Sequence, residues 1–174
     1  MPGTTRPPLS RRLQARFFRV ANVPMRLILG LPVPTPLGRN LMLAFIIGRK
    51  TGRIYRQPLS YVRDGDALLT PGGGKWKFNL VSGAPVRIRL RGKDISATPE
   101  LVGDVDQVGR LLRVMAAGNP AAARFVGIQR GADGSFDRDG VARAVQYGFR
   151  IVRWHPAAPV ATSASPATSP AAGL

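Results

Sequence analysis

The sequence contains no cysteine, one histidine (His155) and one glutamate (Glu100). Without cysteine, a disulfide, a thiol nucleophile, a zinc ribbon and an iron–sulfur cluster are all excluded. A single imidazole cannot build a metal site of several histidines, so no metal site is expected. These absences argue against a hydrolase and against a metalloenzyme. An enzyme of this composition would rely on a bound cofactor for its chemistry.

Acidic residues are scarce compared with basic ones. The 174 residues include 26 Lys+Arg and only 9 Asp+Glu, which gives a formal net charge of +17. Residues 1–40 hold 7 Arg and no acidic residue. Such a chain is expected to bind an anion, whether a phosphate, a polycarboxylate, a nucleic acid or an acidic membrane face. The predominance of Arg over Lys fits the codon bias of a GC-rich genome, but that bias does not explain the sign of the charge.

Long hydrophobic runs are also missing. No apolar run reaches the roughly 18 residues that a membrane-spanning helix needs. The arginine-rich N-terminus is not followed by the uninterrupted apolar segment of a secretory signal, so a cytoplasmic protein is expected. Residues 1–9 and the uncharged Pro/Ala/Ser/Thr tail 156–174 are predicted to be disordered. Residues 37–155 are predicted to form a single β-rich domain.

Residues 10–36 are predicted to form an amphipathic helical segment and a proline-rich linker. Ser10 is a suitable helix N-cap, and Leu13, Phe17 and Val20 would share one helix face flanked by arginines. Such a helix can lie on an anionic membrane surface, which would make the protein peripheral on the inner face of the plasma membrane. The alternative is that the same face packs on the barrel or on a second subunit of a homodimer.

The pattern of residues 37–155 predicts a mainly β fold with added helices (α+β). Short apolar or alternating runs predict strands at 41–47, 53–63, 66–70, 85–91, 94–102 and 149–154, with a break at Pro71–Gly74. Pro58 within the second run indicates an edge strand or a bulge. Asp104 would cap one helix, a second would span about 121–129, and 131–140 would be a loop. Five or six antiparallel strands of this kind predict a small barrel.

Three short segments could bind a ligand. The turn Gly48-Arg-Lys-Thr-Gly52 offers two cations, backbone N–H groups and a hydroxyl to a phosphate or carboxylate, although basic turns are also common without a ligand. Gly72–Gly74 would let the backbone approach a ligand closely, or would simply be a flexible turn. Trp76 could place its indole against a flat ring, or be a core aromatic.

Six motifs in this order resemble the deazaflavin-dependent nitroreductase family of actinobacteria. The resemblance covers about residues 39–117, and a weaker resemblance extends over residues 145–155. The motifs are Gly48-Arg-Lys-Thr-Gly52, Pro58-Leu59, Arg63-Asp64-Gly65, Gly72-Gly73, Trp76-x-x-Asn79-Leu80 and the strand start Pro85–Ile88.

The resemblance implies a split antiparallel β-barrel of the FMN-binding-like type. It also implies binding of coenzyme F420, a deazaflavin with a phosphate and an oligoglutamate tail, with FMN as the alternative cofactor. A hydride would pass from the reduced deazaflavin to a small or lipid-soluble acceptor such as a quinone, a nitro compound or an activated alkene. The cofactor-binding residues that follow are Arg49, Lys50, Thr51, Gly72, Gly73, Trp76 and Asn79.

The sequence departs from the family pattern at several positions. Tyr55 stands where many members have an arginine, which Arg53 or Arg56 would replace. A lysine usual just before the glycines is absent, and Lys75 would compensate for it. The tyrosines that family members use toward nitro and quinone acceptors have no counterpart, so Tyr147 becomes the candidate proton donor, or else a core aromatic at the start of a strand.

Two functions of other classes remain as alternatives. A basic barrel could bind nucleic acid through Arg87, Arg89, Arg91 and Trp76, but such a surface would need more aromatic side chains for base stacking. The barrel could also be a non-catalytic carrier of the deazaflavin or of a lipid.

Overall fold

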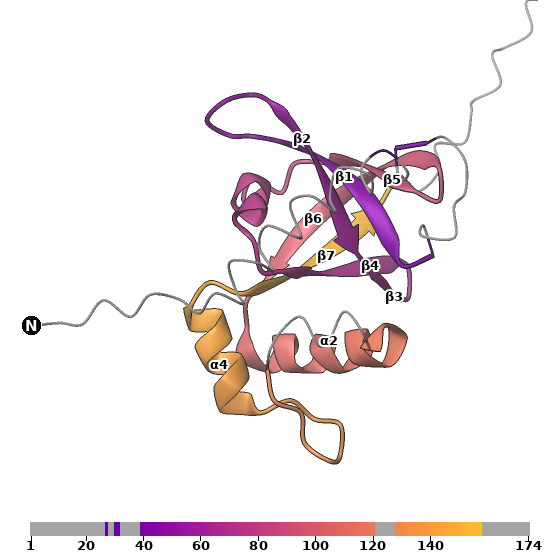
Figure 1. Cartoon of the computed structure of the whole chain (residues 1–174). Coiled ribbons are helices and arrows are strands. Elements are labelled where there is room, and N and C mark those ends of the chain that lie inside the picture. Colours follow the sequence, from indigo (N-terminus) through magenta and orange to yellow (C-terminus); the bar gives the residue numbers. More distant parts are fainter. Residues whose placement is uncertain (1–26, 28–29, 32–38, 121–127, 158–174) are drawn as a thin grey trace, which may run out of the picture.

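The protein is described here by a computed structural model, which places residues 27, 30–31, 39–120 and 128–157. Within these residues, seven strands form a single antiparallel sheet in the order β2-β1-β5-β6-β7-β4-β3 (Figure 1). The strands are β1 (Leu41–Ile47), β2 (Ile54–Ser60), β3 (Val62–Asp64), β4 (Ala67–Gly72), β5 (Val86–Leu90), β6 (Lys93–Val102) and β7 (Arg150–Pro156). The helices are the 3-10 helix η2 (Lys75–Leu80), α2 (Val105–Gly118) and α4 (Arg138–Gln146).

The connection between β2 and β3 explains why the sheet curls. These strands form the two opposite edges of the sheet, yet only Tyr61 separates them in the chain. The edges must therefore lie near one another, and β2 does contact β4. The sheet consequently wraps into a half-barrel, which confirms the predicted split-barrel class. Pro58 lies on the edge strand β2, as its missing N–H requires.

The interior of the curled sheet is an apolar core. Met42, Ala44 and Ile46 alternate along β1 and point into it, each at most 1 % exposed. Trp154 of β7 is fully buried in the same core, and its indole N–H donates to Thr70 Oγ1 at 3.0 Å. The tryptophan therefore buries a large apolar ring without leaving its donor unsatisfied.

Two helices cover the outer face of the other half of the sheet (Figure 1). The helix α2 begins at the N-cap Asp104, whose carboxylate accepts from the Gln107 N–H at 2.8 Å. The second core contains buried residues from α2, α4 and the strands β3, β4, β6 and β7, namely Val62, Leu69, Val102, Val108, Leu111, Leu112, Met115, Val141 and Ile151. The barrel thus has one core inside and a second core beneath its helices.

An ion-pair cluster lies on the outer face of β5 and β6. Arg89 donates to both oxygens of Asp94, at 2.5 and 2.7 Å, and its Nη1 also donates to the Gly30 carbonyl. The hydrogen bond from Arg89 holds the pKa of the Asp94 carboxyl below its ordinary value of 3.8.

The lowered pKa of Asp94 predicts an acid-sensitive contribution to stability. The folded protein holds the carboxylate charged to lower pH than the unfolded chain does, so the contribution is present above pH 3.8 and is lost as the pH falls below it. We expect Asp94→Asn to cost about 1 kcal/mol at pH 7, because the pair is partly exposed, and less at pH 3. Urea unfolding of the wild type and the variant at both pH values measures the difference in the free energy of unfolding. A cost independent of pH would contradict the expectation.

Several predicted elements need correction. The predicted break at residues 71–74 is wrong at its start, because Pro71 and Gly72 continue β4 and pair with β7. The predicted loop 131–140 is wrong at its end, because α4 already begins at Arg138, capped by Asp137. The predicted strand 53–63 is interrupted at Tyr61. The predicted N-terminal helix, most of the helix at 121–129 and nearly all of the C-terminal tail lie outside the described residues.

Candidate functional site

A pocket of about 550 Å³ lies between the β1–β2 hairpin, η2 and the start of β5. Its volume falls within the roughly 300–1,000 Å³ range of small-molecule and cofactor sites. It is lined by Phe45, Ile46, Ile47, Arg49, Ile54, Asn79, Leu80, Ser82, Ala84, Pro85, Val86 and Arg87. Most of these side chains are apolar, and the two charged ones are both arginines.

The hairpin turn at residues 48–52 contributes Arg49 to the lining of this pocket. The Gly48 N–H donates to the Arg53 carbonyl at 2.8 Å, and the Gly52 N–H donates to the Gly48 carbonyl at 2.8 Å. Gly52 adopts a φ of +65°, which favours glycine. At Gly48, an added Cβ would lie 2.6 Å from the Tyr55 ring. The two glycines thus fix a tight turn that projects its basic residues outward.

A side-chain hydrogen bond joins this turn to η2. The backbone N–H of Arg49 donates to Asn79 Oδ1 at 3.1 Å, across 30 residues of sequence. Both residues were predicted from the sequence as cofactor-binding residues, and both line the pocket. Asn79 therefore holds the hairpin and the 3-10 helix at a fixed separation around the pocket.

The pocket combines apolar surface with positive charge. Ile47 and Ile54 face each other across the hairpin and are 61 % and 60 % exposed. The Arg87 guanidinium lies over the Phe45 ring, 3.8 Å from its centroid. A planar apolar ring could bind along these walls, while Arg49 and Arg87 would attract an anionic group attached to it.

The other predicted hairpin residues do not line the pocket. Lys50, Arg53 and Arg56 are exposed on the turn and on β2. The Thr51 hydroxyl lies 3.3 Å from the Tyr55 hydroxyl and 3.4 Å from the Arg53 N–H, so it contacts the turn itself. These residues extend the positive surface beyond the rim.

The glycine and tryptophan motifs support the fold next to the pocket. A Cβ on Gly72 would lie 2.6 Å from the Arg150 carbonyl oxygen, so close strand pairing requires this glycine. Gly73 and Lys75 are exposed. Trp76 stacks on Trp154 with ring centroids 6.5 Å apart and packs against the barrel core. The structure therefore favours the core interpretation of Trp76, although this ring also anchors η2.

Lys77 is a buried lysine on the same helix. It is 4 % exposed, and its ammonium donates to the Gly74 carbonyl at 2.9 Å and lies 4.7 Å from the Phe78 ring centroid. Burial lowers the pKa of Lys77, and the nearby charge of Arg150 lowers it further. The side chain ties η2 to the glycine segment and is not part of the pocket lining.

Tyr147 does not lie at the pocket. It is the C-cap residue of α4 and is 89 % exposed. It is neither a core aromatic nor a lining residue, and α4 lies below the barrel while the hairpin lies above it (Figure 1). Among the described residues, no group of three His, Asp or Glu side chains could hold a metal ion.

Sequence reasoning missed most of the apolar lining. The sequence predicts only a strand at Phe45 and Ile46. Val86 and Arg87 belong to the motif Pro85–Ile88 of the family resemblance, and Arg87 is also a candidate nucleic-acid contact. Ser82 and Ala84 connect the motif that ends at Leu80 to the motif that starts at Pro85, but neither motif indicates that this connection lines a pocket.

A family model and several solved structures are similar to this chain. The model of a family described as F420H(2)-dependent quinone reductase matches residues 12–133. No curated protein matches. A proposed 5-nitroimidazole antibiotic resistance protein from Bacteroides thetaiotaomicron has 12 % identity and a TM-score of 0.47 over 67 % of this chain and 72 % of its own. A proposed pyridoxamine 5'-phosphate oxidase from Listeria innocua has 11 % identity and a TM-score of 0.43, over 69 % and 87 %.

The family match spans well over half of the chain and includes the hairpin, η2 and the strands that surround the pocket. It confirms the deazaflavin dependence that the sequence motifs predicted and names quinone as the acceptor. No helix among the described residues is both long and apolar enough to cross a membrane. The chain belongs to the F420H(2)-dependent quinone reductase family and is an F420-dependent oxidoreductase.

Proposed function

We propose that the pocket between the hairpin, η2 and β5 seats the deazaflavin ring and that the basic hairpin turn holds the anionic tail of F420. The observation that carries this proposal is the hydrogen bond from the Arg49 N–H to Asn79 Oδ1, which places a basic turn at the rim of an apolar pocket. The ring is flat, with faces that stack on apolar side chains, and the tail is anionic. Both chemistries therefore have a counterpart in the residues present.

The chain's own residues bind and orient rather than react. Phe45 and Ile46 form an apolar wall, and Arg49 and Arg87 supply charge at the rim. Reduced deazaflavin, when bound, supplies a hydride to the acceptor. Binding in a defined orientation is itself a large catalytic contribution, because it replaces a bimolecular encounter by a positioned one.

A quinone is the acceptor that we propose first. Its two-electron reduction to a hydroquinone takes one hydride and one proton. The exposed Ile47 and Ile54 give the rim an apolar surface suited to such an acceptor, and water at the open rim can provide the proton. Nitro compounds and activated alkenes accept a hydride by similar chemistry and belong in the same assay.

The direct test is titration of the purified protein with F420, followed by quenching of the cofactor's fluorescence, alongside FMN and single-stranded DNA. Turnover of F420H2 with a quinone, a nitro compound and an activated alkene then ranks the acceptors. Binding of F420 with quinone turnover supports the proposal. Binding without turnover of any acceptor would support the carrier alternative instead.

The nucleic-acid alternative is weakened by the described contacts. Arg89 is hydrogen-bonded to both oxygens of Asp94 and to the Gly30 carbonyl. This side chain is engaged within the barrel wall and is not free to bind a nucleic-acid phosphate. Tight binding of DNA with a steep dependence on salt, together with no binding of F420, would restore that alternative.

We expect Asn79→Ala to weaken F420 binding about five- to tenfold. The variant removes the acceptor of the Arg49 N–H, and one hydrogen bond is worth about 0.5–1.5 kcal/mol. The same fluorescence titration measures the change. Ser82→Ala serves as the matched control, since Ser82 lines the pocket but forms no described bond to the hairpin. An equal loss in both variants would contradict a specific role for Asn79.

A further inference from the structure

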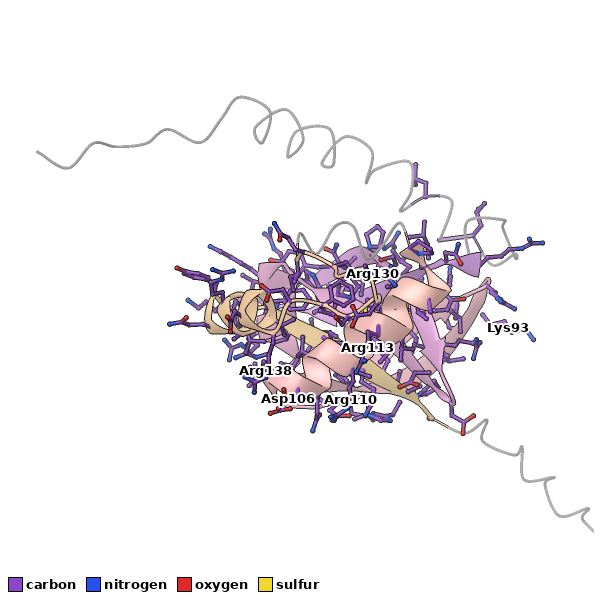
Figure 2. All side chains as sticks on the ribbon, turned by 90° about the horizontal axis from the view of Figure 1, so that it is seen from below. Lys93, Asp106, Arg110, Arg113, Arg130 and Arg138 are labelled. Atoms are coloured by element: carbon purple, nitrogen blue, oxygen red, sulfur yellow. The ribbon has the colours of Figure 1, made fainter. Side chains whose placement is uncertain are left out.

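A second hollow lies on the opposite side of the molecule, between α2 and the segment that leads into α4. Its volume is about 180 Å³. It is lined by Val105, Asp106, Gly109, Arg110, Arg113, Ser135, Phe136, Arg138 and Val141. Figure 2 shows Arg110 and Arg113 of α2, with Arg138 of α4 nearby, on the side of α2 that faces away from the sheet. The cofactor pocket uses none of these residues.

The charges in this hollow are only partly compensated. Asp106 pairs with Arg138, whose Nε donates to Asp106 Oδ1 at 3.0 Å. Within the residues that the structure places, Arg110 and Arg113 form no ion pair and no hydrogen bond with a side chain. They lie three residues apart on one exposed helix face. Arg110 also acts electrostatically on Asp106, and Arg113 on Asp133, and each adds to the hydrogen bonds that lower the pKa of that carboxyl. Neither arginine is held by a direct polar contact with a described side chain, so both planar guanidinium groups can turn to one anion.

Gly109 gives independent support for a site. Glycine in a helix interior costs up to about 1 kcal/mol relative to alanine. An added Cβ at Gly109 would meet no atom within 4 Å, so packing does not require a glycine here. The missing side chain instead keeps the hollow open beside Arg110 and Arg113.

We propose that this hollow binds the phosphate group of a phosphate monoester that is distinct from the F420 cofactor. Arg110 and Arg113 pair with the phosphate oxygens through charge-assisted hydrogen bonds. Val105 and Phe136 line the same hollow and offer an apolar contact to a small organic group on the ester. Phosphate is preferred over carboxylate because one anion must accept hydrogen bonds from two separate guanidinium groups at once.

The experiment is calorimetric titration of the full chain with phenyl phosphate and with inorganic phosphate at constant ionic strength. We expect Arg110→Gln with Arg113→Gln to weaken phenyl phosphate binding at least 30-fold, since each lost charge-assisted bond removes about one decade. Affinity for F420 should not change in this variant. The matched control Arg63→Gln with Lys93→Gln removes the same charge elsewhere and should keep the affinity within about twofold.

Gly109→Ala separates the site from general folding effects. It should raise the melting temperature by about 2–4 °C, because alanine favours the helix. It should nevertheless weaken phenyl phosphate binding about tenfold, because the added methyl group occupies the hollow. No binding by the wild type, unchanged affinity in the Arg110/Arg113 variant, or equal losses in the charge control would each overturn the proposal.

A last arm distinguishes the two sources of a phosphate monoester. Vesicles containing phosphatidic acid present the group as a lipid headgroup, whereas phenyl phosphate presents it in solution. If the wild type sediments with these vesicles and the Arg110/Arg113 variant does not, the site is supported and its ligand is a lipid headgroup. Binding of phenyl phosphate alone supports the same site with a soluble ligand.

Discussion

Replacing Arg49 and Lys50 together by alanine is expected to weaken F420 binding about a hundredfold while the protein stays folded. Hydrogen bonds to charged groups contribute about 1.5–3 kcal/mol each, and the exposed position of both side chains places their contributions at the low end. Alanine keeps the backbone N–H of residue 49, which Asn79 accepts, so the turn should keep its shape. Fluorescence quenching of F420 gives the affinity, and circular dichroism checks the fold.

The control for this prediction is Arg63→Ala with Lys93→Ala, which removes the same charge at exposed positions away from the pocket. If the control loses as much affinity as the hairpin variant, the effect is that of net charge alone. If the folded hairpin variant binds F420 as tightly as the wild type, the anion-binding site lies elsewhere.

Trp154→Ala is expected to lower the free energy of unfolding by about 4 kcal/mol or more. Removing a buried tryptophan costs about 3–5 kcal/mol, and the buried Thr70 hydroxyl would also lose its partner. This is a large part of the roughly 5–15 kcal/mol that stabilises a typical protein. Trp76 would lose its stacking partner, so η2 and Asn79 should become less ordered and F420 affinity should fall as well.

Urea unfolding measures this cost, and Trp154→Phe is the graded comparison. Phenylalanine keeps one aromatic ring but loses the rest of the indole and its N–H, so it should cost about 2 kcal/mol, less than alanine. If Trp154→Ala lowers the free energy of unfolding by less than about 1 kcal/mol, the core collapses around the cavity. The packing of Trp154 then contributes less to stability than the burial of its side chain indicates.

Local patterns predicted the elements whose signals lie within a few residues. The apolar run at residues 41–47 and the alternation at 85–91 predicted β1 and β5, because a strand's side chains alternate between its faces. Asp104 predicted the start of α2, since a short carboxylate can cap the first turn. The sequence does not predict α4, because Gly140 and Asp139 in its first turn and Asp133 and Asp137 before it resemble a loop.

The candidate site was predicted in part for the same reason. Arg49 and Asn79 belong to motifs with recognisable spacing, and the structure brings both to one pocket. Trp76 belongs to the same motif, but its ring turns to Trp154, which lies 78 positions further along the chain. No local pattern indicates which side of a 3-10 helix faces the core.

The sequence by itself determined the positive charge, the absence of cysteine and of histidine clusters, the order of the strands along the chain and the motifs that place the protein among the F420-dependent reductases. Only the tertiary structure decided that β1, η2 and β5 enclose one pocket and that α2 and α4 enclose another. The physical reason is the closure of the sheet. Tyr61 alone connects its two edge strands, so the sheet must curl, and curling brings together residues that no sequence spacing relates.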